Sequence, residues 1–131
     1  MTRFLMVAAG GAAGAMARYA LGLAAGRLAP SMAWPVGTFT ANVLGGLLMG
    51  LLAGWLALKA GTGVDHERLR LLLGVGLLGG FTTFSAFGFE TFQLANQGHL
   101  ARAGLNILLT NAACLGAVWL GFRFVERFAG T

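Results

Sequence analysis

Four long apolar stretches constrain the fold of this chain more than any other feature. They cover roughly residues 4–28, 36–58, 69–95 and 100–122. Each is longer than the roughly 20 residues that an α-helix needs to cross a bilayer. Only 10% of the residues are charged, against about 25% in a soluble domain. We therefore expect an all-α integral membrane protein, with four transmembrane helices in a single domain of residues 1–131.

The charged and reactive residues exclude several other classes of protein. The net charge is +5, but the basic residues are scattered singly and form no stripe for nucleic acid, so they are better explained as flanks of membrane helices. The single cysteine, Cys114, permits no intrachain disulfide. No His, Asp or Glu pair has metal-ligand spacing, and no Ser-His-Asp set can be assembled. The sequence therefore predicts that the protein is not an enzyme.

The distribution of basic residues bears on orientation. Two or three lie on one side of the predicted bundle, and six lie at the termini and the second loop: Arg3, Lys59, Arg68, Arg70, Arg123 and Arg127. This bias favours a cytoplasmic location of both termini. In so small a protein it leaves the orientation open.

Glycine pairs spaced by four residues occur in the first three stretches. Such pairs allow close approach of helices in lipid. The pairs are Gly10/Gly14, Gly22/Gly26, Gly46/Gly50/Gly54 and Gly76/Gly80. Four short helices that use so many small faces cannot easily enclose a polar path, so we infer a homo-oligomer, most simply a dimer.

The third stretch carries an unusual polar segment from Gly79 to Phe87. Two adjacent glycines and three hydroxyl residues suit an unbroken lipid-facing helix poorly, and non-helical backbone survives at this depth only inside protein or beside water. If the helix breaks here, the backbone carbonyls near Gly79 and Thr82 could hold a small cation. The alternative is an intact helix whose hydroxyl groups bond to the carbonyl one turn back.

Three phenylalanines, Phe81, Phe84 and Phe87, recur at three-residue spacing and are expected near one helix face. Such a stripe is commonly packing. The alternative uses the positive edges of the rings, which attract an anion without a full charge. Neutral donors at comparable depth in other stretches favour an anion path over a cation path. They are Asn42, Thr110 and Asn111.

Two charged residues, Arg18 and Glu90, lie away from the ends of the stretches, and intramembrane charges are functional candidates by default. Arg18 either lines a vestibule that concentrates anions or extends to the interface. Glu90 is expected to hold structure through a helix end or an arginine, or likewise to reach the interface.

The chain resembles the Fluc (CrcB) family of fluoride channels over nearly its whole length. Three blocks carry the resemblance: Gly10-Gly11-Ala12-Ala13-Gly14-Ala15-x-x-Arg18-Tyr19, then Pro35-x-Gly37-Thr38-x-x-x-Asn42-x-x-Gly45, and Gly79-Gly80-Phe81-Thr82-Thr83-Phe84-Ser85-x-Phe87 followed by Glu90-Thr91. The resemblance implies an antiparallel, dual-topology homodimer of four-helix subunits, each with its third helix broken in mid-membrane.

The resemblance also implies roles for individual residues. Phe84 and Phe87 match paired pore phenylalanines whose edges face fluoride, Asn42 a pore asparagine, Ser85 the start of a polar track, and Thr110 a hydroxyl position. The carbonyls of Gly79 and Thr82 match those that hold a structural sodium ion at the dimer interface. Ala86 stands where relatives often carry threonine, which removes one hydroxyl group from the track.

The function implied by the resemblance is passive fluoride efflux across the inner (plasma) membrane, which lowers fluoride toxicity in the cytoplasm. Two other functions remain open. A small dual-topology, proton-coupled cation or drug antiporter needs a membrane-buried carboxylate, for which Glu90 is the only candidate. A non-transporting membrane assembly subunit would use the glycine faces to bind a different protein.

Overall fold

The computed structural model describes residues 1–29, 34–60 and 65–129, and all regular structure within them is helical. Four helical segments are long and apolar enough to cross a membrane, which confirms the prediction of an all-α chain with four such helices. The first is α1 (Thr2–Leu28), the second α2 (Val36–Leu58) and the fourth α6 (Leu100–Ala129). The third span, His66–Asn96, is composite: α3 (His66–Leu69), η1 (Arg70–Leu78), α4 (Gly79–Phe81) and α5 (Phe84–Asn96).

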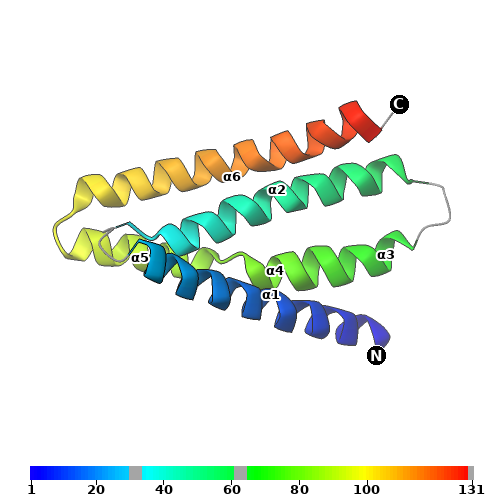
Figure 1. Ribbon diagram of the computed structural model, residues 1–131, viewed down its shortest axis with the longest axis horizontal. Helices are drawn as coiled ribbons and strands as arrows, with labels where there is room; N and C mark the ends of the chain where they lie inside the picture. The colour runs from blue at the N-terminus through cyan, green and yellow to red at the C-terminus, as the bar shows by residue number, and fades with distance from the viewer. Residues whose placement is uncertain (30–33, 61–64, 130–131) are drawn as a thin grey trace.

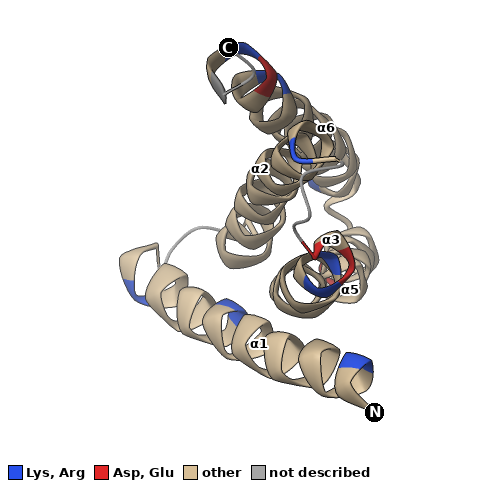
Figure 2. Ribbon diagram, turned by 90° about the vertical axis from the view of Figure 1, so that its right-hand side faces the viewer, with Lys and Arg blue, Asp and Glu red and all other residues tan. Residues whose placement is uncertain are grey.

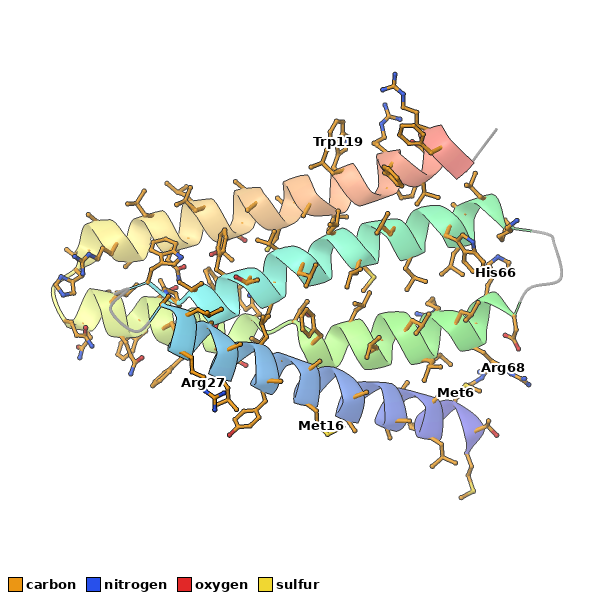
Figure 3. The ribbon with its side chains drawn as sticks, in the orientation of Figure 1. Met6, Met16, Arg27, His66, Arg68 and Trp119 are labelled. Carbon is orange, nitrogen blue, oxygen red and sulfur yellow. The ribbon has the colours of Figure 1, made fainter. Side chains whose placement is uncertain are left out.

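The spans lie side by side and alternate in direction along the chain (Figure 1). The first and third spans run one way, α2 and α6 run the other way, and both termini lie at the same end. Seen closer to end-on, α1 packs against the third span while α2 packs along α6 (Figure 2). Met16 on α1 and Trp119 on α6 project away from the bundle on opposite sides (Figure 3).

Glycines set the closest contacts between the spans. A Cβ atom at Gly10 or Gly14 would collide with the backbone of η1, at the carbonyls of Leu72 and Leu77 respectively. On the other side of the bundle, a Cβ at Gly50 would collide with the carbonyl of Val118 in α6. These positions therefore act as predicted, as faces where backbones touch. Gly26 does not, because a Cβ there would meet nothing within 4 Å.

The third span departs from regular α-helix at two places. Residues Arg70–Leu78 form a π-helix, a rare form often found at functional sites. Thr82 (ψ 159°) and Thr83 (φ −152°, ψ 115°) are extended between α4 and α5. We call these two residues the extended pair.

The connections that the structure describes follow from local sequence. Between α5 and α6, Gly98 adopts φ +84°, a left-handed conformation that favours glycine. Between the second and third apolar stretches, Asp65 caps α3 by accepting a hydrogen bond from the Arg68 amide, so the third span begins at His66, before the predicted residue 69. Residues 30–33 and 61–64, which lie between the first three stretches, are outside the described residues.

Candidate functional site

Thr82 keeps one helical hydrogen bond, from its amide to the Leu78 carbonyl (3.0 Å), whereas the backbone of Thr83 is held by a side chain. Asn42 of α2 binds the backbone of Thr83 at both ends of its amide: Nδ2 donates to the Thr83 carbonyl (3.0 Å) and Oδ1 accepts from the Thr83 amide (2.7 Å). The Thr83 hydroxyl accepts from the Ala86 amide at 3.2 Å and so caps the start of α5. One asparagine and one threonine thus fix the conformation at this point.

These bonds redirect two backbone amides away from their usual acceptors. In a continuous α-helix the Thr83 amide would donate to the Gly79 carbonyl, and the Ala86 amide to the Thr82 carbonyl. Here they donate to Asn42 and to the Thr83 hydroxyl. The neighbouring Gly80 carbonyl accepts from Nε of Arg18 at 3.1 Å. The carbonyls of Gly79 and Thr82 are therefore among the four, from Gly79 to Thr82, that lose their α-helical donors at the break.

A groove of about 310 Å³ lies beside the extended pair, between α2, α5 and α6. Most of its wall is apolar, and we call it the polar groove for the amide and hydroxyl groups that it contains. It brings together six of the candidate site residues singled out in the sequence: Asn42, Thr82, Phe84, Phe87, Thr110 and Asn111. Arg18, Gly79 and Ser85 do not line it. Cys114 and Thr83 also contribute to its walls.

The two aromatic residues of the groove form a pair, but they differ in exposure. The ring centroids of Phe84 and Phe87 are 5.3 Å apart, with 51° between the ring planes. Phe87 is 7% exposed, whereas Phe84 is 78% exposed and lies at the open side. Phe81 belongs to α4, on the other side of the extended pair. The prediction that it shares a helical face with the other two is wrong, because the helix is interrupted between them.

A buried chain of polar side chains connects α5 to α6 behind the groove. The Thr110 hydroxyl donates to Oδ1 of Asn106 (3.2 Å), Nδ2 of Asn106 donates to the Thr91 hydroxyl (2.8 Å), and that hydroxyl donates to the Phe87 carbonyl (2.7 Å). Asn106 is only 1% exposed. The sequence analysis missed this residue, although an amide four residues before Thr110 on an apolar helix is a detectable signal.

A second hollow on the α1 side of the extended pair contains Arg18, Thr38, Thr83 and Ala86. Thr83 therefore borders both hollows, and its hydroxyl lies 3.2 Å from that of Ser85. Nearby, the Thr38 hydroxyl donates to Oε1 of Glu90 at 2.7 Å. The partner of Glu90 recorded in the described residues is thus a threonine in the first turn of α2, a contact at a helix end as expected, and no bond from Glu90 to an arginine is recorded there.

The chemistry of the polar groove is that of a weak site for a small anion. Its polar groups are neutral amides and hydroxyls, and its aromatic rings can offer positive edges. Sites of this kind bind an ion without the full charge that would slow its release. The four spans and this groove define the class: a small multi-pass membrane protein with a groove that holds neutral polar side chains between its helices.

Comparison with known proteins narrows the class to a family. The family model described as "CrcB-like protein, Camphor Resistance (CrcB)" matches residues 5–122. The chain belongs to this family.

Curated relatives match nearly the full length of the chain. A protein of Caulobacter sp. (strain K31) is 48% identical over 127 residues, with 97% of each chain covered. One from Phenylobacterium zucineum is 50% identical over 128 residues (97% of this chain, 98% of the relative), and one from Geobacter sulfurreducens is 43% identical over 121 (92% and 94%). All three are named "Fluoride-specific ion channel FluC".

Proposed function

We propose that this protein is a fluoride-selective channel of a bacterial plasma membrane, through which fluoride leaves the cell passively and its toxicity in the cytoplasm falls. The observation that carries the proposal is the polar groove. In it Phe84 and Phe87 are paired beside the hydroxyls of Thr83 and Thr110, in a chain whose full-length relatives are named fluoride-specific channels.

Fluoride is small and strongly hydrated, so a conducting path must replace its water in steps. In our proposal ring edges of Phe84 and Phe87 take over part of the hydration, and hydroxyls such as those of Ser85 and Thr110 take over the rest. Asn42 uses one N–H on the Thr83 carbonyl, and its amide group carries a second N–H for the ion. Arg18, with its guanidinium at the second hollow, raises the anion concentration near the path.

The open groove supports a homodimer. Phe84 is 78% exposed and borders a groove that a single subunit leaves open. A second copy would close it, and an antiparallel arrangement would give two equivalent paths. In this arrangement the extended pairs of the two subunits would meet in the middle of the membrane, where protein or water must surround an interrupted helix.

A sodium ion at the dimer interface is part of the same proposal. The carbonyls of Gly79 and Thr82 lose their helical donors to Asn42 and Thr83, and uncharged carbonyl oxygens are ligands for such an ion. A pair of carbonyls from each subunit would hold it. The ion would neutralise the carbonyl dipoles that meet there and would not itself be transported.

The proposal is tested by fluoride release from liposomes that contain the purified protein, with chloride release as the selectivity control. We expect fast release of fluoride and none of chloride. Phe84→Ile should reduce fluoride release to the background, because it removes the ring edge, while the fold is retained at this exposed position.

The matched control is Phe89→Ile. Phe89 lies on α5 as well and is 60% exposed, but it does not line the groove. The Phe89→Ile variant should release fluoride as fast as the unmodified protein. Full conduction by Phe84→Ile would remove the role given to the ring edge. Proton-coupled cation uptake without fluoride release would favour the antiporter, and a tightly bound foreign protein without any flux would favour the assembly subunit.

A further inference from the structure

A second groove, of about 490 Å³, lies between α2 and α6, toward the C-terminal end of α6. Its walls are apolar and include Leu47, Leu51, Trp119 and Leu120. It shares no residue with the polar groove. We call it the α2–α6 groove. Trp119, 60% exposed, projects from α6 away from the bundle (Figure 3).

Two arginines, Arg123 and Arg127, also line this groove. They are four residues apart on α6 and therefore share one face of the helix. Arg123 binds Oε2 of Glu126 at 2.9 Å, so part of its charge is already compensated. Within residues 65–129 the structure records no ion pair for Arg127. The blue and red residues at the C-terminal end of α6 are visible in Figure 2.

The order of these groups along the helix matches the order of groups along a phospholipid. Leu47, Leu51 and Trp119 lie deeper in the span, and Arg127 lies at its end, where a long basic side chain reaches the headgroup level. We propose that the α2–α6 groove binds an anionic phospholipid, with an acyl chain along the apolar wall and the phosphate at Arg127 and Arg123.

Charge complementarity favours a lipid over a second copy of the chain as the occupant. The basic end of α6 needs a negative partner. The opposite end of the bundle carries Arg27, Arg102 and Glu90, but Oε1 of Glu90 accepts from Thr38 and its Oε2 is buried. An antiparallel copy laid on the groove would therefore bring exposed positive charge, not negative, to Arg127. An anionic headgroup supplies the missing charge.

The experiment uses Trp119 as the reporter. In a Trp34→Phe/Trp55→Phe background it is the only remaining tryptophan. The protein is placed in bilayers of phosphatidylcholine that contain increasing fractions of phosphatidylglycerol brominated on its acyl chain, or of equally brominated phosphatidylcholine, and quenching of Trp119 gives relative binding. We expect a preference of about fivefold or more for phosphatidylglycerol, the contribution of one basic residue near a membrane surface.

Variants of the two arginines test the phosphate-binding role that we assign to them. Arg127→Gln should abolish most of the preference, and Arg123→Gln should reduce it less, because Arg123 shares its charge with Glu126. Arg3→Gln is the matched control: it removes a positive charge at the same end of the bundle but outside the groove. Circular dichroism checks that each variant is folded.

Three results would overturn the proposal. Equal quenching by the two lipids would mean that the headgroup is not recognised. Absence of quenching by either lipid would mean that another polypeptide covers the groove. An equal loss of preference in Arg3→Gln and Arg127→Gln would mean that only the overall charge of this end attracts the lipid.

Discussion

Asn42 makes two hydrogen bonds to the backbone of a single residue, Thr83. Such a side chain substitutes for a missing strand or helix partner, since it supplies an acceptor and a donor with the spacing of a peptide unit. The extended pair cannot satisfy these backbone groups within its own span. Asn42 is thus a structural clamp as well as a candidate ligand for the ion.

Replacing Asn42 by alanine should destabilise the protein. Each orphaned backbone group in a buried setting costs about 1–3 kcal/mol, so the midpoint of thermal unfolding in detergent should fall by several degrees, together with fluoride release. Asn111→Ala is the control for stability, because Nδ2 of Asn111 donates to Ile107 one turn earlier on its own helix and is exposed. A Tm unchanged in Asn42→Ala but lowered in Asn111→Ala would contradict the clamp.

The sequence predicts which residues belong to the candidate site better than it predicts the contacts that they make. Asn42, Phe84, Phe87 and Thr110 are visible as polar or aromatic residues at unusual depth, and the structure brings them to one groove. Asn106 and Thr83 are detectable as polar residues in the same way, but the hydrogen bonds that they make depend on which side chain of another span lies opposite. Local sequence does not contain that information.

At the scale of whole helices, the first and third spans contact each other through glycine residues. Gly10 and Gly14 of α1 lie against Leu72 and Leu77 of η1, and Gly80 of α4 lies against Gly11. Backbone contact of this kind leaves no space for a methyl group. The packing therefore depends on the absence of side chains, not on their shape.

Gly14→Ala should consequently separate α1 from η1 and lower the thermal stability by more than about 1 kcal/mol, measured as the unfolding midpoint in detergent. Gly88→Ala is the matched control at a glycine that contacts no other helix. A Cβ at Gly88 meets nothing within 4 Å, so alanine within α5 should leave stability unchanged or raise it by about 0.5–1 kcal/mol. Equal behaviour of the two variants would refute the close-contact explanation.

The proposed sodium ion is also a property of elements, because it would join the ends of α4 from two subunits. Removal of sodium, with N-methyl-D-glucamine as the replacement cation, should lower the unfolding midpoint and release monomers in cross-linking experiments. Sodium should restore both, and the stabilisation should increase with its concentration as expected for a bound ligand. An unfolding midpoint that is independent of sodium would count against the site.

Among the elements, α2 covers the same residues as the second apolar stretch, Val36–Leu58. Because it is uniformly hydrophobic and Lys59 follows directly, both of its ends can be predicted from the sequence. The π-helix at Arg70–Leu78 and the extended pair cannot be predicted in this way. They arise because α1 and Asn42 offer contacts that a regular helix would not make, and hydrophobic pattern alone does not distinguish the two outcomes.

For the molecule as a whole, the distribution of charge favours a single membrane orientation, whereas the proposed dual topology requires two. Six basic residues lie at the end that carries both termini, against Arg27 and Arg102 at the other. A bias of this kind favours one orientation. Antiparallel dimers require both.

We expect both orientations in cells. In a Cys114→Ala background, Arg3→Cys and Arg27→Cys place a thiol at opposite ends of α1. If the chain inserts both ways, a membrane-impermeant maleimide added to intact cells should label each variant in part. Complete labelling of one variant and none of the other would mean a single orientation, and the antiparallel dimer would then be wrong.

Because α1 begins and α6 ends at the same end of the bundle, gene fusion has a predictable outcome. A short hydrophilic linker that joins the last residue of one copy to the first of another keeps both ends of the linker on one side of the membrane, so the two copies are forced to be parallel. Only a linker that itself crosses the bilayer allows the second copy to be inverted. The even number of spans therefore dictates which tandem proteins of this kind can assemble and which cannot.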